Sequence, residues 1–346
     1  MRNRALAADL LGRLAMRRHD YAAAAEYAAR SEHAGESYVQ FNPSDLSAWD
    51  YWIRGKEQMS DVLFERGQVL DSIDVLRATV ALEKDSRLPS SLGPQLNFAW
   101  SDLALREARI GQRTDAENAL QEARRANAEL LKVAGDTGQW RLLLPVMPDA
   151  WQSRIQLYFG EHQAAMDRST AASRRLRDTK LTADDENAQR IRANLMSFML
   201  GTTAMSALRL ARDAEAEQAL RERLSLPSNP FTGADPLDEI SRSQVMLAHA
   251  VARQGRSEEA LEILRPALQH YRIEQGQGLG GITFQRDLAY ALYANALAQD
   301  EGVVGRKEKV ASLREAAGLV AAMPSEARQL WDVREVANLI AAAQGG

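Results

Sequence analysis

The feature that most constrains this chain is the period of its apolar residues, which recur at steps of three and four over most of the 346 positions. That is the period of an α-helix, and the clean alternation typical of a strand is almost absent. Prolines interrupt the periodic segments at intervals of roughly 45 to 50 residues, with one double interval between Pro148 and Pro227. Each interval has room for two helices and a short turn. The sequence therefore predicts an all-α array of helical hairpins.

A pattern of small and apolar residues repeats within this array. The two fullest copies place matching residues at Trp100, Leu103, Ala104, Gly111, Ala116, Leu120 and Ala123, and at Leu247, Ala248, Val251, Gly255, Ala260, Leu264 and Ala267. Further copies run through Leu11, Gly12, Ala15, Ala24 and Ala28, and through Leu63, Gly67, Ser72 and Leu76, with weaker ones around Gly160 and Ala214. This pattern resembles the tetratricopeptide repeat (TPR).

The resemblance explains why the pattern uses these residue types. Small residues let the two helices of a hairpin cross closely, and the neighbouring leucines fill the space beside the crossing. Gly111 and Gly255 stand where the chain leaves a helix and needs a positive φ. Many of the 58 alanines fall at such crossing positions, so their number reflects more than helix propensity.

What the resemblance implies is a right-handed α-solenoid of about six to seven TPR-like hairpins, forming one domain over residues 1–346. Repeats are expected over residues 5–322, followed by a capping helix over residues 325–343. The helices look longer than the usual repeat allows, which is more like the irregular arrays of bacterial regulatory proteins than like consensus arrays.

Charge and composition exclude most other classes. The chain has 43 Lys and Arg against 47 Asp and Glu, so no basic excess indicates a nucleic acid or an anionic membrane. The absence of cysteine excludes disulfides, thiolate metal sites and cysteine nucleophiles. The glycine-rich stretch at 276–281 follows no predicted strand and lacks the residues of a phosphate loop. No pair of the histidines has metal-ligand spacing on one helix: His19, His33, His162, His249 and His270.

These observations predict a cytoplasmic protein that is not an enzyme and has no cofactor. No apolar run is long enough to span a bilayer, and the N-terminus lacks the uninterrupted apolar stretch of a signal peptide. We expect a scaffold that binds a protein or peptide. The alternative is a ligand- or peptide-sensing module of a larger bacterial signalling protein, fused to an upstream effector such as a DNA-binding or kinase domain.

In TPR arrays the first helix of each hairpin lines a concave groove, which is where partner peptides lie. Carrying that register onto this chain gives six candidate partner-binding residues: Arg13, Glu57, Asp61, Arg154, Arg242 and His249. The lysine and asparagine clamp of the chaperone-binding members is not reproduced, because its positions hold Asp9, Arg13, Glu57, Asp61, Ser101 and Leu105. The mixed lining favours a partner that carries both charges.

Two segments depart from the regular array and allow two interpretations each. The aromatic-rich segment from Ser37 to Trp52 is either a buried staple between repeats or an exposed platform for a ligand. The proline-rich segment from Leu224 to Glu239 is expected to be a loop, either a simple connection or a gate over the groove.

Overall fold

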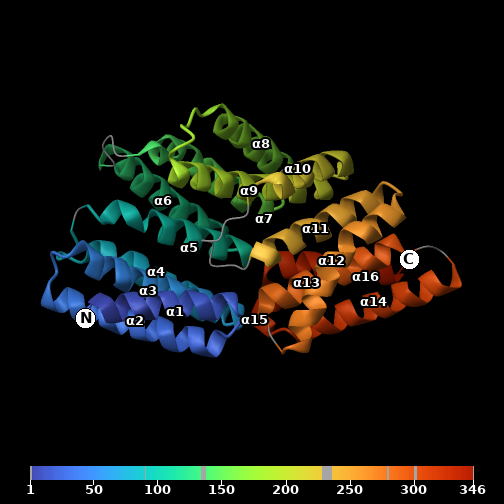
Figure 1. The fold of residues 1–346 in the computed structure, drawn as a ribbon, viewed down its shortest axis with the longest axis horizontal. Coiled ribbons are helices and arrows are strands. Elements are labelled where there is room, and N and C mark those ends of the chain that lie inside the picture. Colours follow the sequence, from blue (N-terminus) through green and yellow to red (C-terminus); the bar gives the residue numbers. More distant parts are fainter. Residues whose placement is uncertain are drawn as a thin grey trace. The chain divides into compact units, whose positions relative to one another are not determined.

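The structure is a computed structural model that describes residues 2–89, 91–133, 138–227, 236–278, 280–299 and 302–345. Over these ranges the chain forms 16 α-helices and three short 3-10 segments, and the described residues contain no strand (Figure 1). The helices follow one another as antiparallel pairs. The predicted all-α array of hairpins is therefore confirmed.

The chain divides into two compact units, Met1–Thr137 and Gly138–Gly346, which we describe one at a time. That residues 1–346 form a single right-handed superhelix stays a prediction. No helix among the described residues is both long and apolar enough to cross a membrane.

Unit 1 holds three hairpins. They pair α1 (Arg2–Arg17) with α2 (Tyr21–Phe41), α3 (Leu46–Glu65) with α4 (Val69–Val80), and α5 (Asn97–Arg109) with α6 (Arg113–Val133). The 3-10 segments η1 (Ala81–Lys84) and η2 (Gly93–Leu96) lie between α4 and α5.

Unit 2 opens with η3 (Gln139–Val146) and holds four hairpins. They pair α7 (Met147–Tyr158) with α8 (His162–Asp178), α9 (Glu186–Arg209) with α10 (Asp213–Ser225), α11 (Pro236–Arg253) with α12 (Ser257–Gly276), and α13 (Ile282–Ala298) with α14 (Val303–Ala322). The C-terminal segment consists of the single turn α15 (Ser325–Gln329) and of α16 (Trp331–Gly345), which packs on α13 and α14.

The turn inside six of these hairpins has one common geometry. The residue just past the first helix has a positive φ, between 55° and 84°: His19, Gly67, Gly111, Gly160, Ala211 and Gly255. In the α5–α6 turn the Gly111 amide donates to the Ala108 carbonyl at 3.0 Å, and the Gln112 amide donates to the Glu107 carbonyl at 2.9 Å. These two bonds satisfy carbonyls that the end of the helix leaves open. The predicted role of Gly111 and Gly255 is confirmed.

Alanine and glycine permit the close helix contacts. Ala104, Ala116 and Ala123 are fully buried between α5 and α6, as the repeat pattern predicts. The closest approach joins α2 and α3, where a methyl group added at Gly35 would lie 2.5 Å from the Trp52 amide nitrogen. These two helices therefore meet at backbone distance, a contact that the sequence comparison of repeats did not single out.

The two tryptophans of the aromatic-rich segment form a buried staple between repeats, as in the first of the two interpretations. Trp49 is completely buried and Trp52 is 8% exposed, with their ring centroids 5.4 Å apart. They pack with Val39 and Leu92, from neighbouring parts of unit 1. In the predicted loop from Leu224 to Glu239, α10 ends at Ser225 and residues 228–235 lie outside the described residues.

The order of contacts gives each unit two layers. Each second helix packs on the first helix of its own hairpin, and every second helix except the last one of a unit also packs on the first helix of the next hairpin. First helices also contact each other, as α1 with α3, α7 with α9 and α11 with α13 do. First helices therefore form one layer and second helices the other, which is a TPR-like arrangement. We call the exposed side of these two layers the first-helix face and the second-helix face of a unit.

Candidate functional site

The first-helix face of unit 1 is rich in carboxylates. Glu57 and Asp61 lie one turn apart on α3, and Asp102 lies near them on α5. Two of the predicted partner-binding residues, Glu57 and Asp61, are thus brought together. Asp102 was missed, because only a comparison of side-chain positions on α3 and α5 shows that it faces them.

The proximity of these carboxylates changes their protonation. Enclosure by protein and the charges of Asp102 and Asp61 raise the pKa of Glu57 to about 8. Enclosure and the charge of Asp61 raise the pKa of Asp102 to about 7, although its side chain remains exposed to solvent. Glu57 is half-buried and forms no ion pair with any described residue, so it is the group on which a pH dependence of this face rests most firmly.

Three arginines partly neutralise this face. Arg106 pairs with Asp61 and donates to the Ser60 carbonyl at 2.8 Å. Arg54 pairs with Asp50 at 3.0 Å. The predicted residue Arg13 lies on α1, where it pairs with the buried Asp9 at 3.1 Å while its own side chain is 43% exposed. With Asp102 and Glu57 included, carboxylates still exceed guanidinium groups.

The first-helix face of unit 2 is built around arginines. Arg154 on α7 donates from Nε to the Thr202 hydroxyl at 2.9 Å and from Nη2 to the Phe198 carbonyl at 3.1 Å. Its guanidinium lies 4.4 Å from the centre of the Phe198 ring, in cation–π contact. Arg223, from the second helix α10, reaches the same place and donates from Nε to the Ser197 hydroxyl at 3.0 Å.

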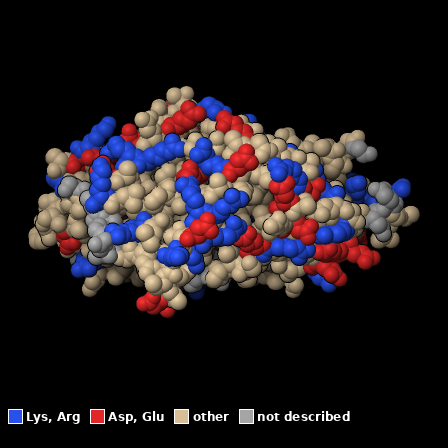
Figure 2. Space-filling view, turned by 90° about the horizontal axis from the view of Figure 1, so that it is seen from above, with Lys and Arg blue, Asp and Glu red and all other residues tan. Residues whose placement is uncertain are grey.

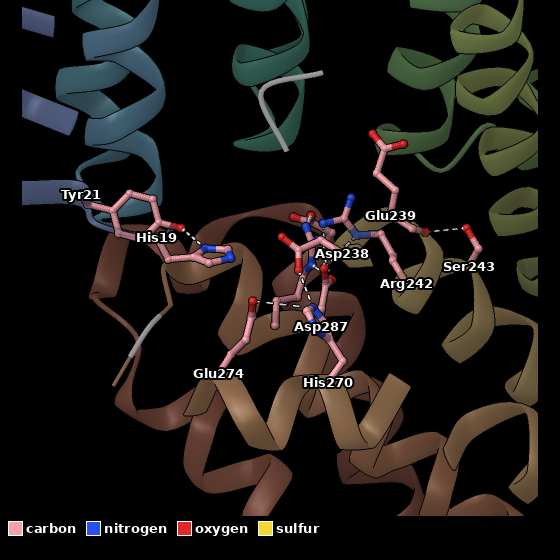
Figure 3. Close-up of polar contacts among 11 residues, drawn as sticks. His19, Tyr21, Asp238, Glu239, Arg242, Ser243, His270, Glu274 and Asp287 are labelled. Carbon is pink, nitrogen blue, oxygen red and sulfur yellow. Dashed lines mark hydrogen bonds and ion pairs between the residues drawn. The ribbon is translucent and has the colours of Figure 1, made fainter. Parts of the chain in front are cut away.

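A second arginine site lies on α11. Arg242 donates to the buried carboxylate of Asp287 on α13 at 2.8 Å, and Arg286 donates to the other oxygen of Asp287 at 2.6 Å. Figure 3 shows Arg242 and Asp287 approaching each other, with His270 and Asp238 beside them. His270 Nε2 lies 2.8 Å from a carboxylate oxygen of Asp238. The predicted residues Arg154 and Arg242 are thus both on this face. Burial lowers the pKa of Arg223, and the charges of Arg242 and Arg154 add to that effect, to a value of about 10.

His249 requires a correction. It was expected to face the groove, yet its side chain is only 2% exposed and cannot contact a partner. Tyr290 and Tyr293 on α13 cover it, with ring centroids 5.6 Å and 5.2 Å away, and its Nδ1 lies 2.6 Å from the Tyr290 hydroxyl. Burial, with the charges of Arg253 and Arg209, lowers its pKa to about 3. His249 therefore has a packing role.

The second-helix face of unit 2 has the opposite character, because its charges are paired. Arginines on one second helix reach glutamates on the next: Arg177 to Glu222, Arg221 to Glu259, and Arg272 to Glu315, each at 2.7 Å. On the side of the molecule drawn in Figure 2, basic and acidic side chains are likewise interspersed. Arg175 and Arg177 likewise pair with carboxylates, those of Asp149 and Glu222, so this helix surface is charge-balanced.

The comparisons with known proteins add little to this geometry. No family model matches the chain, and no curated protein matches it. Among solved structures, a crystal structure of the P58(IPK) TPR domain aligns with 99% of this chain and 99% of its own, at 12% identity and a TM-score of 0.24. A score this low carries no argument. The description of the chain as a TPR-like helical array rests on the layers, turns and small-residue contacts described above.

Proposed function

We propose that this protein is a non-enzymatic scaffold that binds a protein or peptide partner on its first-helix faces. The observation that carries the proposal is the difference between the two kinds of face. On the second-helix face of unit 2, arginines and glutamates neutralise one another across hairpins. On the first-helix faces, Glu57 in unit 1 and Arg223 in unit 2 form no ion pair with any described residue.

Ionisation of Glu57 beside other carboxylates is unfavourable, and a basic group from a partner would favour its ionised form. Arg223 lies near other arginines of the same charge, and an acidic group from a partner would offset that repulsion. Unit 1 would favour a basic group and unit 2 an acidic group. This supports the expectation of a partner that carries both charges. The bacterial, cytoplasmic and regulatory context remains part of the proposal and rests on the resemblance to irregular bacterial arrays.

The test is a selection of random displayed peptides on the full chain, followed by fluorescence anisotropy with the selected peptides. Glu57→Gln combined with Asp61→Asn removes charge from the first-helix face of unit 1. The matched control is Glu262→Gln, at an exposed position of α12. We expect basic peptides to lose affinity for the first variant only. If no peptide is selected, or if both variants bind alike, the proposal is wrong.

A further inference from the structure

A pocket of about 590 Å³ opens in unit 1 between the second helices α4 and α6. The first helix α5 forms its floor and lies between the other two helices in Figure 1. The buried residues Val80, Leu103 and Ala119 and the half-buried Trp100 supply the apolar part of its lining. Sites for small ligands typically enclose about 300–1,000 Å³, so this pocket has the size of such a site.

Carboxylates gather at the end of the pocket nearest the α5–α6 turn. Glu107 is 2% exposed; its Oε1 accepts from Arg77 Nη2 at 2.9 Å, and its Oε2 accepts no hydrogen bond from any described residue. Burial raises the pKa of Glu107, and the negative charge of Asp115 adds to that rise. Asp115 lines the same pocket and forms no ion pair with a residue that the structure describes, while Arg77 is shared with Asp74 at 3.2 Å. A cation bound at this end would therefore offset the repulsion between the carboxylates.

The opposite end of the pocket carries an unpaired ammonium group. Lys84, in η1, lines the pocket and forms no ion pair with any residue in the described ranges. It lies at the Trp100 end, because Trp100 Nε1 is 3.4 Å from Oε2 of Glu83, the residue before Lys84. Glu83 and Glu122, which also line this end, are both paired with Arg125. The charge left without a partner here is that of Lys84, which would attract an anionic group.

The distance between the two ends sets the length of a ligand that reaches both. Trp100 and Glu107 are seven residues apart on α5, which is about 10 Å along a helix that rises about 1.5 Å per residue. An extended peptide spans about 3.3–3.6 Å per residue, so about three residues fit between the ends. Asn118 and Gln121 lie three residues apart on α6 and also line the pocket. Their amide groups offer the donors and acceptors that a peptide backbone needs.

We infer that this pocket binds a free peptide of about three residues, with its N-terminal ammonium beside Glu107 and Asp115 and its C-terminal carboxylate beside Lys84. The order of the charges sets the direction of the peptide, from the α5–α6 turn towards η1. A central apolar side chain would pack on Trp100 and Leu103. The pocket lies between second helices, so this activity is separate from partner binding on the first-helix faces.

The experiment uses the full chain and the tripeptide alanyl-phenylalanyl-alanine, titrated by isothermal calorimetry. We expect the tripeptide with free termini to bind. Acetylation of its N-terminus and amidation of its C-terminus should each weaken binding about fivefold, as expected for loss of one partly exposed ion pair. Free alanine, which is too short to reach both ends, should bind more weakly than either blocked tripeptide.

Two variants assign each terminus to its end of the pocket. Lys84→Gln should weaken binding of the free tripeptide about fivefold and leave the affinity of the C-terminal amide unchanged, because the amide has no carboxylate to lose. Asp115→Asn should act in the same way on the free and the N-acetylated peptides. The matched control is Lys307→Gln, at an exposed position of α14, which removes the same charge and should leave all affinities unchanged. Circular dichroism checks that each variant folds.

The inference is overturned if the free tripeptide does not bind or if the blocked peptides bind as tightly as the free one. It is equally overturned if Lys84→Gln weakens the free and amidated forms alike, or if Lys307→Gln weakens binding as much as Lys84→Gln. Failure of this site would leave the proposed function intact, because that function rests on the first-helix faces and is tested there by Glu57→Gln with Asp61→Asn.

Discussion

The turn between α9 and α10 uses an alanine where four equivalent turns use glycine, and this difference predicts a stability change of known sign. Ala211 has a φ of 57°, in the left-handed region, and its amide donates to the Leu208 carbonyl in the same pattern as the glycine turns. The corresponding residue of the α11–α12 turn is Gly255, with a φ of 78°. We therefore predict that Ala211→Gly stabilises the protein and that Gly255→Ala destabilises it.

The magnitude follows from two opposing effects. An L-residue in the left-handed region costs about 1–2 kcal/mol relative to glycine. Glycine in turn loses about 0.4–1 kcal/mol of stability through the greater freedom of the unfolded chain. The net gain expected for Ala211→Gly is about 0.5–1 kcal/mol. Gly255→Ala should cost a similar amount, because the added methyl group would meet no atom within 4 Å and only the backbone strain remains.

The assay is urea unfolding followed by circular dichroism, with the midpoint compared at an unchanged slope. The control is Ala311→Gly, at an exposed position in the middle of α14, where the same substitution should destabilise by about 1 kcal/mol through helix propensity alone. The reasoning is refuted if Ala211→Gly lowers the midpoint as Ala311→Gly does, since the turn would then impose no left-handed strain on alanine.

Three further changes test other parts of the structure. The pKa of Glu57 is about 8 in the folded chain against an ordinary 4.5, so between these pH values the folded chain binds a proton that the unfolded chain does not. Stability should therefore fall as pH rises through this window, and Glu57→Gln should flatten the profile of urea midpoint against pH. Parallel profiles for the two proteins would contradict the raised pKa. Gly35→Ala should destabilise the protein by about 1–3 kcal/mol because the added methyl group would clash with the α3 backbone. As a control, Gly318→Ala should stabilise α14, because a methyl group there would meet no atom within 4 Å. Equal shifts of the urea midpoint would disprove the close contact at Gly35. His249 has a pKa of about 3 against an ordinary 6.5, so below pH 6.5 the unfolded chain takes up a proton that the folded chain does not, and stability is lost as pH falls. His249→Phe should lose less stability than the unmodified chain when urea midpoints are measured between pH 4 and 7. An unchanged acid dependence would mean that the histidine is not buried as described.

The sequence predicted the parts of this fold that depend on local pattern. A helix end that needs a left-handed residue favours glycine, so Gly111 and Gly255 could be located without coordinates. Buried crossing positions such as Ala104 could be found because they recur at fixed offsets within each repeat. The same logic failed at His19 and Ala211, which adopt the turn without glycine; at His19 a contact of 2.9 Å between its ring and the Tyr21 hydroxyl supports the turn (Figure 3).

The functional faces were only partly predictable, because they depend on how far a side chain reaches. Repeat register assigns the first-helix face to first helices alone, so Arg154 was expected there and Arg223, on a second helix, was not. A long arginine side chain can extend past its own helix, and Gly201 leaves the space for it. The prediction for His249 was wrong for a related reason, since the two tyrosines that cover it, Tyr290 and Tyr293, lie more than 40 residues away in sequence.

The distribution of paired and unpaired charge says more about partners than the net charge does. The formal charge of −4 predicts no preference for a basic or an acidic partner. On the second-helix face of unit 2, many charged residues already pair with one another across hairpins. The groups that are not neutralised in this way lie on the first-helix faces and differ in sign. They are carboxylates around Glu57 in unit 1 and guanidinium groups around Arg223 in unit 2.

A basic group bound to unit 1 would stabilise the ionised form of Glu57 and so release a proton on binding near neutral pH. An acidic group bound to Arg223 would release none, because that arginine stays charged at neutral pH. Proton release measured by calorimetry in two buffers of different ionisation enthalpy therefore distinguishes binding at unit 1 from binding at unit 2.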